Sequence, residues 1–307
     1  MQSGIVVPAI TPIKADGNVD VSGIESLVDH LIGAGVKGLF IFGTSGEGPS
    51  LTRQQRRVAA IAFVSSTAQR VPVLAGIAGN SVAQCLESLD DVSDAGVDKI
   101  VIMPPFFLAG MGEEIVEQHL RTLATSTSLP VVLYNIPQHT QNPITPHMLG
   151  RLAQIPNVVA LKDSSANSEV FADLLLVGQR SGLEVFQGAE SMIYSGLRAG
   201  ADGAVPGIGN VAPRLVCSLF EAARLGDWDE AERLQNAVDQ ACEILQEAYW
   251  LVALKYAVSR VISSSPALVS SMRSANADEA TAIDQILTAG RIDVTGETLN
   301  FETGGTS

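Results

Sequence analysis

The stretch V-V-A-L-K-D-S-S, residues 158–165, places one lysine at the end of a short apolar run. Apolar runs of this length, rich in Val and Leu, are typical of a strand buried on both faces. Of the five lysines in the chain, only Lys162 lies where such a strand passes into a polar turn. Burial disfavours an ammonium ion, so it favours the neutral, nucleophilic amine that forms Schiff bases with keto compounds. The alternative is a lysine at the rim whose amine reaches water.

Similar β-rich runs recur along the chain and alternate with segments of helical spacing. The runs begin near residues 6, 38, 71, 99, 130, 158, 183 and 203. The helical segments between them include 21–35, 52–69, 81–95, 113–125 and 167–180. Repeated strand–helix units indicate a parallel sheet, and eight of them predict an α/β fold of the (β/α)8 TIM-barrel type. A doubly wound open sheet is the competitor, but no glycine-rich nucleotide loop follows the first run.

After the eighth unit the pattern changes to helices without strands between them. Helical spacing continues over 227–249, 250–263 and 278–290. We therefore expect a barrel at 1–225 and a C-terminal helical extension, packed on the barrel, at 226–293. The polar segment 294–307 is expected to be a flexible tail.

Composition and charge narrow the function classes. The net charge of -14 argues against nucleic acid and anionic membrane surfaces, because no basic patch can neutralise phosphate. No signal-peptide pattern opens the chain, and no apolar run reaches the roughly 18 residues of a membrane span. Three cysteines without metal spacing and four scattered histidines predict reduced thiols and no metal site. We expect a cytoplasmic protein that needs no metal.

Polar residues follow several of the expected strands at their carboxyl ends, where barrels of this type place their active sites. Thr44 and Ser45 lie between two glycines, and such a turn offers backbone N–H groups and hydroxyls to a small carboxylate. Tyr134 ends the fifth strand and can relay protons beside Lys162 on the sixth. Each residue has a structural alternative, namely local backbone hydrogen bonds or a buried phenol. Together they predict a catalytic site.

Three motifs carry a resemblance to a known family. G-T-S-G-E at 43–47, Y-N-I-P at 134–137 and L-K-D-S at 161–164 are similar to those of the dihydrodipicolinate synthase/N-acetylneuraminate lyase family. The resemblance implies a Schiff-base-dependent lyase on a (β/α)8 barrel with additional C-terminal helices. It also implies a homotetramer, built as a dimer of dimers, that uses no cofactor.

The same resemblance implies a role for each site residue. Lys162 would form the Schiff base with pyruvate or another 2-keto acid, and Tyr134 would be the proton shuttle. Thr44 and Ser45 would hold the pyruvyl carboxylate, and the backbone near Val205 would line the same pocket.

Two positions depart from the lysine-biosynthetic synthase of that family. His139 stands where the synthase has an arginine that grips the carboxylate of its second substrate. Histidine is mostly neutral at pH 7 and lacks the planar fork of arginine, so a bidentate carboxylate clamp is lost. Phe107 stands where the synthase has a tyrosine that enters a partner subunit's pocket, and a phenylalanine cannot relay a proton.

These departures favour a different second substrate. Glu190, together with Ser191 and the Gln138–Thr140 segment that contains His139, supplies hydrogen-bonding groups around the mouth, which suit a hydroxylated substrate. We therefore predict retro-aldol cleavage of a 2-keto-3-deoxy sugar acid or 4-hydroxy-2-oxo acid to pyruvate and an aldehyde. The alternatives are dehydration of a 2-keto-3-deoxy acid, dihydrodipicolinate synthesis with an altered clamp, and a keto-acid-binding barrel without turnover. For His139 the alternative is a surface loop residue.

Overall fold

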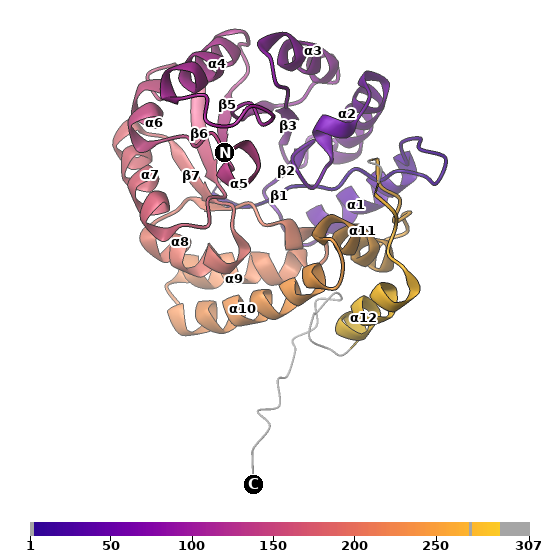
Figure 1. The fold of residues 1–307 in the computed structure, drawn as a ribbon. Helices are drawn as coiled ribbons and strands as arrows, with labels where there is room; N and C mark the ends of the chain where they lie inside the picture. The colour runs from indigo at the N-terminus through magenta and orange to yellow at the C-terminus, as the bar shows by residue number, and fades with distance from the viewer. Residues whose placement is uncertain (1–2, 270–271, 289–307) are drawn as a thin grey trace.

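Eight parallel strands close into a barrel in the computed structural model, which describes residues 3–269 and 272–288. The strands pair in chain order, and β8 returns to β1 to complete the ring (Figure 1). Their bounds are β1 Gly4–Val7, β2 Gly38–Ile41, β3 Val73–Ile77, β4 Lys99–Ile102, β5 Val131–Asn135, β6 Val158–Asp163, β7 Glu184–Gln187 and β8 Gly203–Ala204. The predicted TIM barrel is confirmed.

Helices cover the outer face of the barrel (Figure 1). They are α1 Val21–Gly33, α2 Arg53–Thr67, α3 Val82–Ser93, α4 Glu113–Thr125, α6 Pro146–Leu152, α7 Ser168–Ser181, α8 Ile193–Ala199 and α9 Pro213–Leu225. The short helix α5 Pro137–Thr140 and the 3-10 helices η1 Gly48–Ser50, η2 Glu190–Met192 and η3 Gly207–Asn210 follow β5, β2, β7 and β8 in the chain, and Figure 1 shows α5 over the middle of the ring. Thr52 and Ser81 cap α2 and α3, because each hydroxyl accepts a hydrogen bond from a backbone N–H of the first turn. These caps fix where the two helices begin.

Side chains along the strands alternate between the barrel interior and the layer of helices. Val132 and Ala160 belong to the interior cluster, whereas Leu133 and Leu161 belong to the larger core between strands and helices. Because successive side chains of a strand point to opposite faces, the residue two positions after Ala160 also points inward. That residue is Lys162, at the carboxyl end of β6.

The C-terminal helices pack against one side of the barrel (Figure 1). They are α10 Trp228–Ala241, the 3-10 helix η4 Cys242–Gln246, α11 Trp250–Val261 and α12 Ala277–Thr288. The prediction of one helix over 227–249 is wrong, because the α-helix ends at Ala241 and η4 follows. An uninterrupted helix of that length would run straight for about 35 Å. The turn instead lets α11 fold back onto η4 and contact η3.

The proposed division into a barrel and an extension stays a prediction. Residues 289–290 of the last expected helix, the end of the extension and the tail at 294–307 lie outside the described residues. Within the described ranges, no helix has the length and apolar character needed to cross a bilayer.

Metal ligands are likewise not clustered in the part of the chain that the structure describes. There, no group of three or more His, Cys, Asp or Glu side chains could hold a metal ion. The cysteines are free thiols, and burial raises the pKa of Cys85 to about 12 and that of Cys217 to about 11. Both groups are therefore protonated at neutral pH and are poor nucleophiles.

Candidate active site

Tyr134 and Lys162 face each other from neighbouring strands at the carboxyl end of the barrel. Their Cα atoms are direct partners in the β5–β6 register. The Nζ atom of Lys162 lies 4.3 Å from the centre of the Tyr134 ring and 5.3 Å from the centre of the Phe40 ring. Only 5% of Lys162 and 4% of Tyr134 are exposed. The amine is therefore held at a fixed point, out of bulk water, against two aromatic faces.

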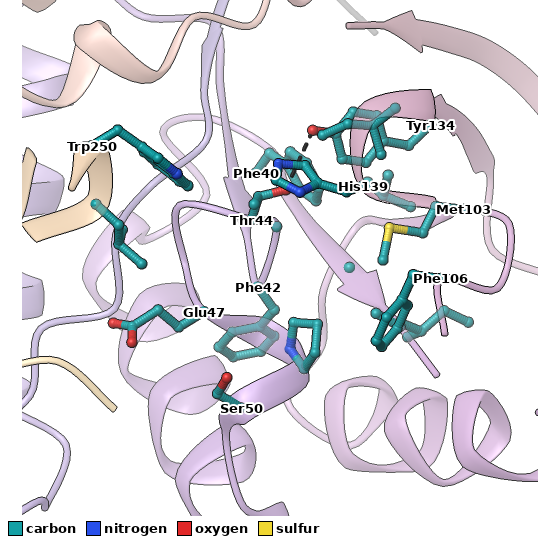
Figure 2. A pocket seen from close by; sticks show the side chains of 18 of the residues that line it. Phe40, Phe42, Thr44, Glu47, Ser50, Met103, Phe106, Tyr134, His139 and Trp250 are labelled. Atoms are coloured by element: carbon teal, nitrogen blue, oxygen red, sulfur yellow. Dashed lines mark hydrogen bonds between the residues drawn. The ribbon is translucent and has the colours of Figure 1, made fainter. Parts of the chain in front are cut away.

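A hydroxyl from a third element joins this pair. The Thr44 Oγ1 atom, in the loop after β2, lies 3.5 Å from the Tyr134 hydroxyl, and Figure 2 marks this hydrogen bond by a dashed line. The Phe40 and Tyr134 rings meet edge to face beneath it, with their centres 5.8 Å apart. The amine, the phenol and the hydroxyl thus converge on the barrel mouth from three separate parts of the sequence.

The backbone of the loop after β2 is tightly constrained. Phe42 and Glu47 both adopt left-handed conformations, with φ of 61° and 53°. A Cβ atom at Gly48 would lie 2.0 Å from the Phe42 carbonyl oxygen, and one at Gly46 would lie 2.8 Å from the Phe42 nitrogen. Left-handed conformations at non-glycine residues are unfavourable and persist only where the surroundings enforce them. The loop therefore holds the Thr44 hydroxyl in a defined position.

A buried ion pair fixes the same loop to α11. The Lys255 Nζ atom lies 2.6 Å from Glu47 Oε1 and donates a second hydrogen bond to the Ala267 carbonyl oxygen. The second carboxylate oxygen of Glu47 accepts a hydrogen bond from the Val269 N–H. The Lys255 side chain is fully buried, and this burial lowers its pKa although the Glu47 carboxylate opposes the shift. The C-terminal helices thus hold the loop that carries Thr44.

Next to Tyr134 and Lys162, a second polar pair joins the same two strands. The Asn135 Nδ2 atom donates a 2.6 Å hydrogen bond to Asp163 Oδ1, and the Asn135 Oδ1 atom accepts one from the Ile144 N–H. Ser165 also donates to the Asp163 carboxylate. Burial raises the pKa of Asp163, while these donors favour its ionised form. The Asn135–Asp163 pair fixes the register that places Tyr134 opposite its lysine.

Replacing Asn135 by leucine is expected to lower the free energy of unfolding by about 1–3 kcal/mol, because it removes the amide donor to Asp163 Oδ1 and the acceptor of the Ile144 N–H. The loss should be larger at pH 7 than at pH 4. Without its amide partner the pKa of Asp163 rises further, and a raised folded-state pKa means that stability falls as pH rises above the unfolded-state value. Urea unfolding at both pH values measures this. An equal loss at both would show that the lost amide donor does not act on the ionised form of the Asp163 carboxylate.

A cavity of about 260 Å³ opens beside the Thr44–Tyr134 pair (Figure 2). Of the predicted site residues, Thr44, Tyr134 and His139 line it. Lys162 lies directly behind two of the lining rings, those of Phe40 and Tyr134. Lys162 itself is not among the lining residues, but its amine lies next to the cavity, in contact with two side chains that form the wall.

The other predicted site residues lie around the loop after β8. Ser45 packs near Gly207, since a Cβ atom there would lie 3.6 Å from the serine Oγ. The Gly207 N–H donates a 2.6 Å hydrogen bond to the Glu190 carboxylate, so this carboxylate stabilises the backbone of the loop after β8. The Val205 side chain belongs to the interior cluster, and none of Ser45, Val205 and Glu190 is among the cavity-lining residues.

Several residues of the site were missed in the sequence. Phe106 and Trp250 line the cavity, whereas Phe107 is 80% exposed. Lys255 carries the same signal that singled out Lys162, a lone lysine within an apolar run, here L-V-A-L-K-Y-A-V at 251–258. This run is long enough to be a helix, and site residues were expected at the carboxyl ends of strands, so Lys255 was not placed near the barrel mouth.

Comparisons with known proteins show the family of the chain. The model of the dihydrodipicolinate synthetase family matches residues 1–290. A DapA-like lyase of Halobacterium salinarum is 32% identical over 285 residues, which cover 92% of this chain and 91% of that protein. A putative 2-dehydro-3-deoxy-D-gluconate aldolase of Escherichia coli, YagE, is 31% identical over 247 residues, 80% of this chain and 82% of that one.

Solved structures show the same architecture. The crystal structure of Escherichia coli YagE in complex with pyruvate superposes with a TM-score of 0.88 at 28% identity, covering 94% of this chain and 98% of that one. The dihydrodipicolinate synthase of Bacteroides thetaiotaomicron gives a TM-score of 0.89 at 31% identity, with the same coverage. The chain belongs to the dihydrodipicolinate synthetase family, and it is a lyase of that family.

Proposed function

We propose that the protein is a Schiff-base lyase that cleaves a 4-hydroxy-2-oxo acid, a class that includes the 2-keto-3-deoxy sugar acids, to pyruvate and an aldehyde. The observation that carries the proposal is the buried Lys162 amine 4.3 Å from the Tyr134 ring, with Thr44 within 3.5 Å of the phenol. The pyruvate bound to the related YagE supports a keto acid as the ligand.

In the proposed reaction the Lys162 amine attacks the C2 carbonyl carbon of the keto acid. Tyr134 gives its proton to the departing water, which leaves the protonated imine and a phenolate. This iminium withdraws electrons, so the C3–C4 bond can break as Tyr134 removes the proton of the C4 hydroxyl. The aldehyde leaves, the enamine takes a proton at C3, and water releases pyruvate and the free amine. Thr44 would hold the phenol and the substrate carboxylate.

Deuterium exchange into pyruvate tests whether the imine and the enamine form, two steps that the lyase and the dehydratase have in common. The enamine is formed reversibly from bound pyruvate, so the methyl protons of pyruvate should exchange in deuterated water, as measured by proton NMR. Pyruvate release from a 4-hydroxy-2-oxo acid, followed in a second assay, then separates the lyase from a dehydratase, which would retain all the carbon atoms in one product. Absence of exchange would leave a keto-acid-binding barrel as the better description.

Dihydrodipicolinate synthesis is less well supported. Among the described residues that line the cavity there is no arginine or lysine, so a second carboxylate has no clamp there. His139 lines the cavity at the position where the synthase has its arginine. If the protein condensed pyruvate with aspartate semialdehyde as fast as it released an aldehyde from a 4-hydroxy-2-oxo acid, the proposed cleavage reaction would be contradicted.

Tyr134→Phe is expected to lower kcat by roughly 100-fold, because general acid–base catalysis by a positioned group contributes this much or more. The ring and its contact with Lys162 remain, so binding of pyruvate should be nearly unchanged. Steady-state kinetics and pyruvate titration check the two parts separately. A variant that retained full kcat would show that another group moves the proton.

The family also implies a homotetramer, and the composition implies a cytoplasmic location. We propose both for this chain, with the small keto acid as its ligand and with no need for a cofactor. Sedimentation equilibrium of the purified protein tests the oligomeric state.

A further inference from the structure

The cavity beside the reactive pair has apolar walls. Phe106 and Met103 lie on one side of it and Trp250 on the opposite side, with Phe42 between them at the lower edge of the view (Figure 2). They come from the loops after β2 and β4 and from the start of α11. This region is where the part of a 4-hydroxy-2-oxo acid beyond C4 would extend, because the Lys162 and Tyr134 side chains define the other end.

Most polar side chains that line the cavity either have hydrogen-bond partners within the protein or are exposed to solvent. The Glu47 carboxylate is bound by Lys255 and the Val269 N–H, so it is not available to a ligand without breaking a buried ion pair. Thr44 and Tyr134 bond to each other at the reacting end. Three further polar side chains, Ser50, His139 and Tyr249, line the cavity and are exposed, and Figure 2 draws the His139 ring next to Thr44.

We infer that the aldehyde half of the substrate is an alkyl or aryl group rather than a polyhydroxylated chain. This inference rests on the proposed lyase function and names its substrate class. Aromatic and thioether side chains give favourable contacts to an apolar group, whereas a sugar hydroxyl placed against them loses its hydrogen bonds to water. A cavity of about 260 Å³ accommodates a group of the size of a phenyl ring.

Two substrates that share the reacting end test the inference. We expect pyruvate release from 4-hydroxy-2-oxo-4-phenylbutanoate to have a kcat/KM at least roughly 100-fold above that from 2-keto-3-deoxygluconate, the size of effect typical of apolar against hydroxyl discrimination. Equal values, or a preference for the sugar acid, would overturn the inference. Exchange of pyruvate protons, measured on the same protein, tells the two proposals apart. Exchange with the wrong preference refutes only the substrate class, and loss of exchange refutes the lyase itself.

Variants of the apolar wall provide a second test. Met103→Gln is close to isosteric and adds an amide, so the ratio of the two kcat/KM values should fall about 10-fold. Phe106→Ala should lower the same ratio by removing the ring. Leu225→Ala, at the end of α9 and 72% exposed, is the control and should leave the ratio unchanged. Because the ratio is measured within one protein, losses from partial unfolding cancel. An unchanged ratio in both wall variants would overturn the inference.

Discussion

Replacing Lys162 by alanine is expected to lower kcat/KM for aldehyde release by on the order of 10⁴-fold or more, because the proposed covalent intermediate forms on this amine. The variant should fold normally, since a small side chain replaces a buried amine that lies against the Phe40 and Tyr134 rings. Proton exchange into pyruvate should be lost to the same extent. Both are measured with the purified protein under identical conditions.

Lys99 offers a matched control for this substitution. It begins β4, at the opposite end of the barrel from Lys162, and also belongs to a barrel strand. Lys99→Ala should therefore retain kcat/KM within experimental error. Substantial turnover in Lys162→Ala, or an equal loss in both variants, would contradict the assignment of the nucleophile.

Lys255→Met is expected to lower the free energy of unfolding by about 3–5 kcal/mol, as is typical when one partner of a buried ion pair is removed. The Glu47 side chain is only 2% exposed, so its carboxylate would remain buried without its ammonium partner. Because Glu47 closes the loop that carries Thr44, kcat should fall as well. Urea unfolding and steady-state kinetics measure the two effects.

The double variant Glu47→Gln/Lys255→Met isolates the unpaired charge. It removes both charges, so we expect it to be more stable than Lys255→Met alone. The Arg273–Glu279 pair is the control, because Arg273 is 62% exposed and its replacement by methionine should hardly change stability. If the double variant were no more stable than the single one, packing and not the buried carboxylate would explain the loss.

The barrel and the reactive pair were predictable because their signals are local. Eight apolar runs at regular spacing define the strands, and period-two alternation sends Lys162 inward from its own strand. Tyr134 follows the same rule on β5. Neighbouring strands in chain order place the two side chains close together, and the β5–β6 register, which shifts between Val131 and Val132, makes them direct partners.

The surroundings of the pair were less predictable, because they depend on tertiary contacts. The sequence does not reveal that the Glu190 carboxylate binds the Gly207 N–H, nor that α11 folds back over the loop after β2. The apolar wall combines residues far apart in the chain, such as Phe106 and Trp250. A helix over 227–249 was predicted because its helical spacing continues past the point where η4 begins.

Mass spectrometry after borohydride reduction in the presence of pyruvate shows whether the Lys162 amine forms an imine with a keto acid. Borohydride reduces an imine to a stable secondary amine, so the adduct records which nitrogen attacked the carbonyl carbon. We expect one reduced pyruvyl group per chain, mapped to the peptide that contains Lys162. An adduct on Lys255 or another amine, or an unmodified protein, would contradict it.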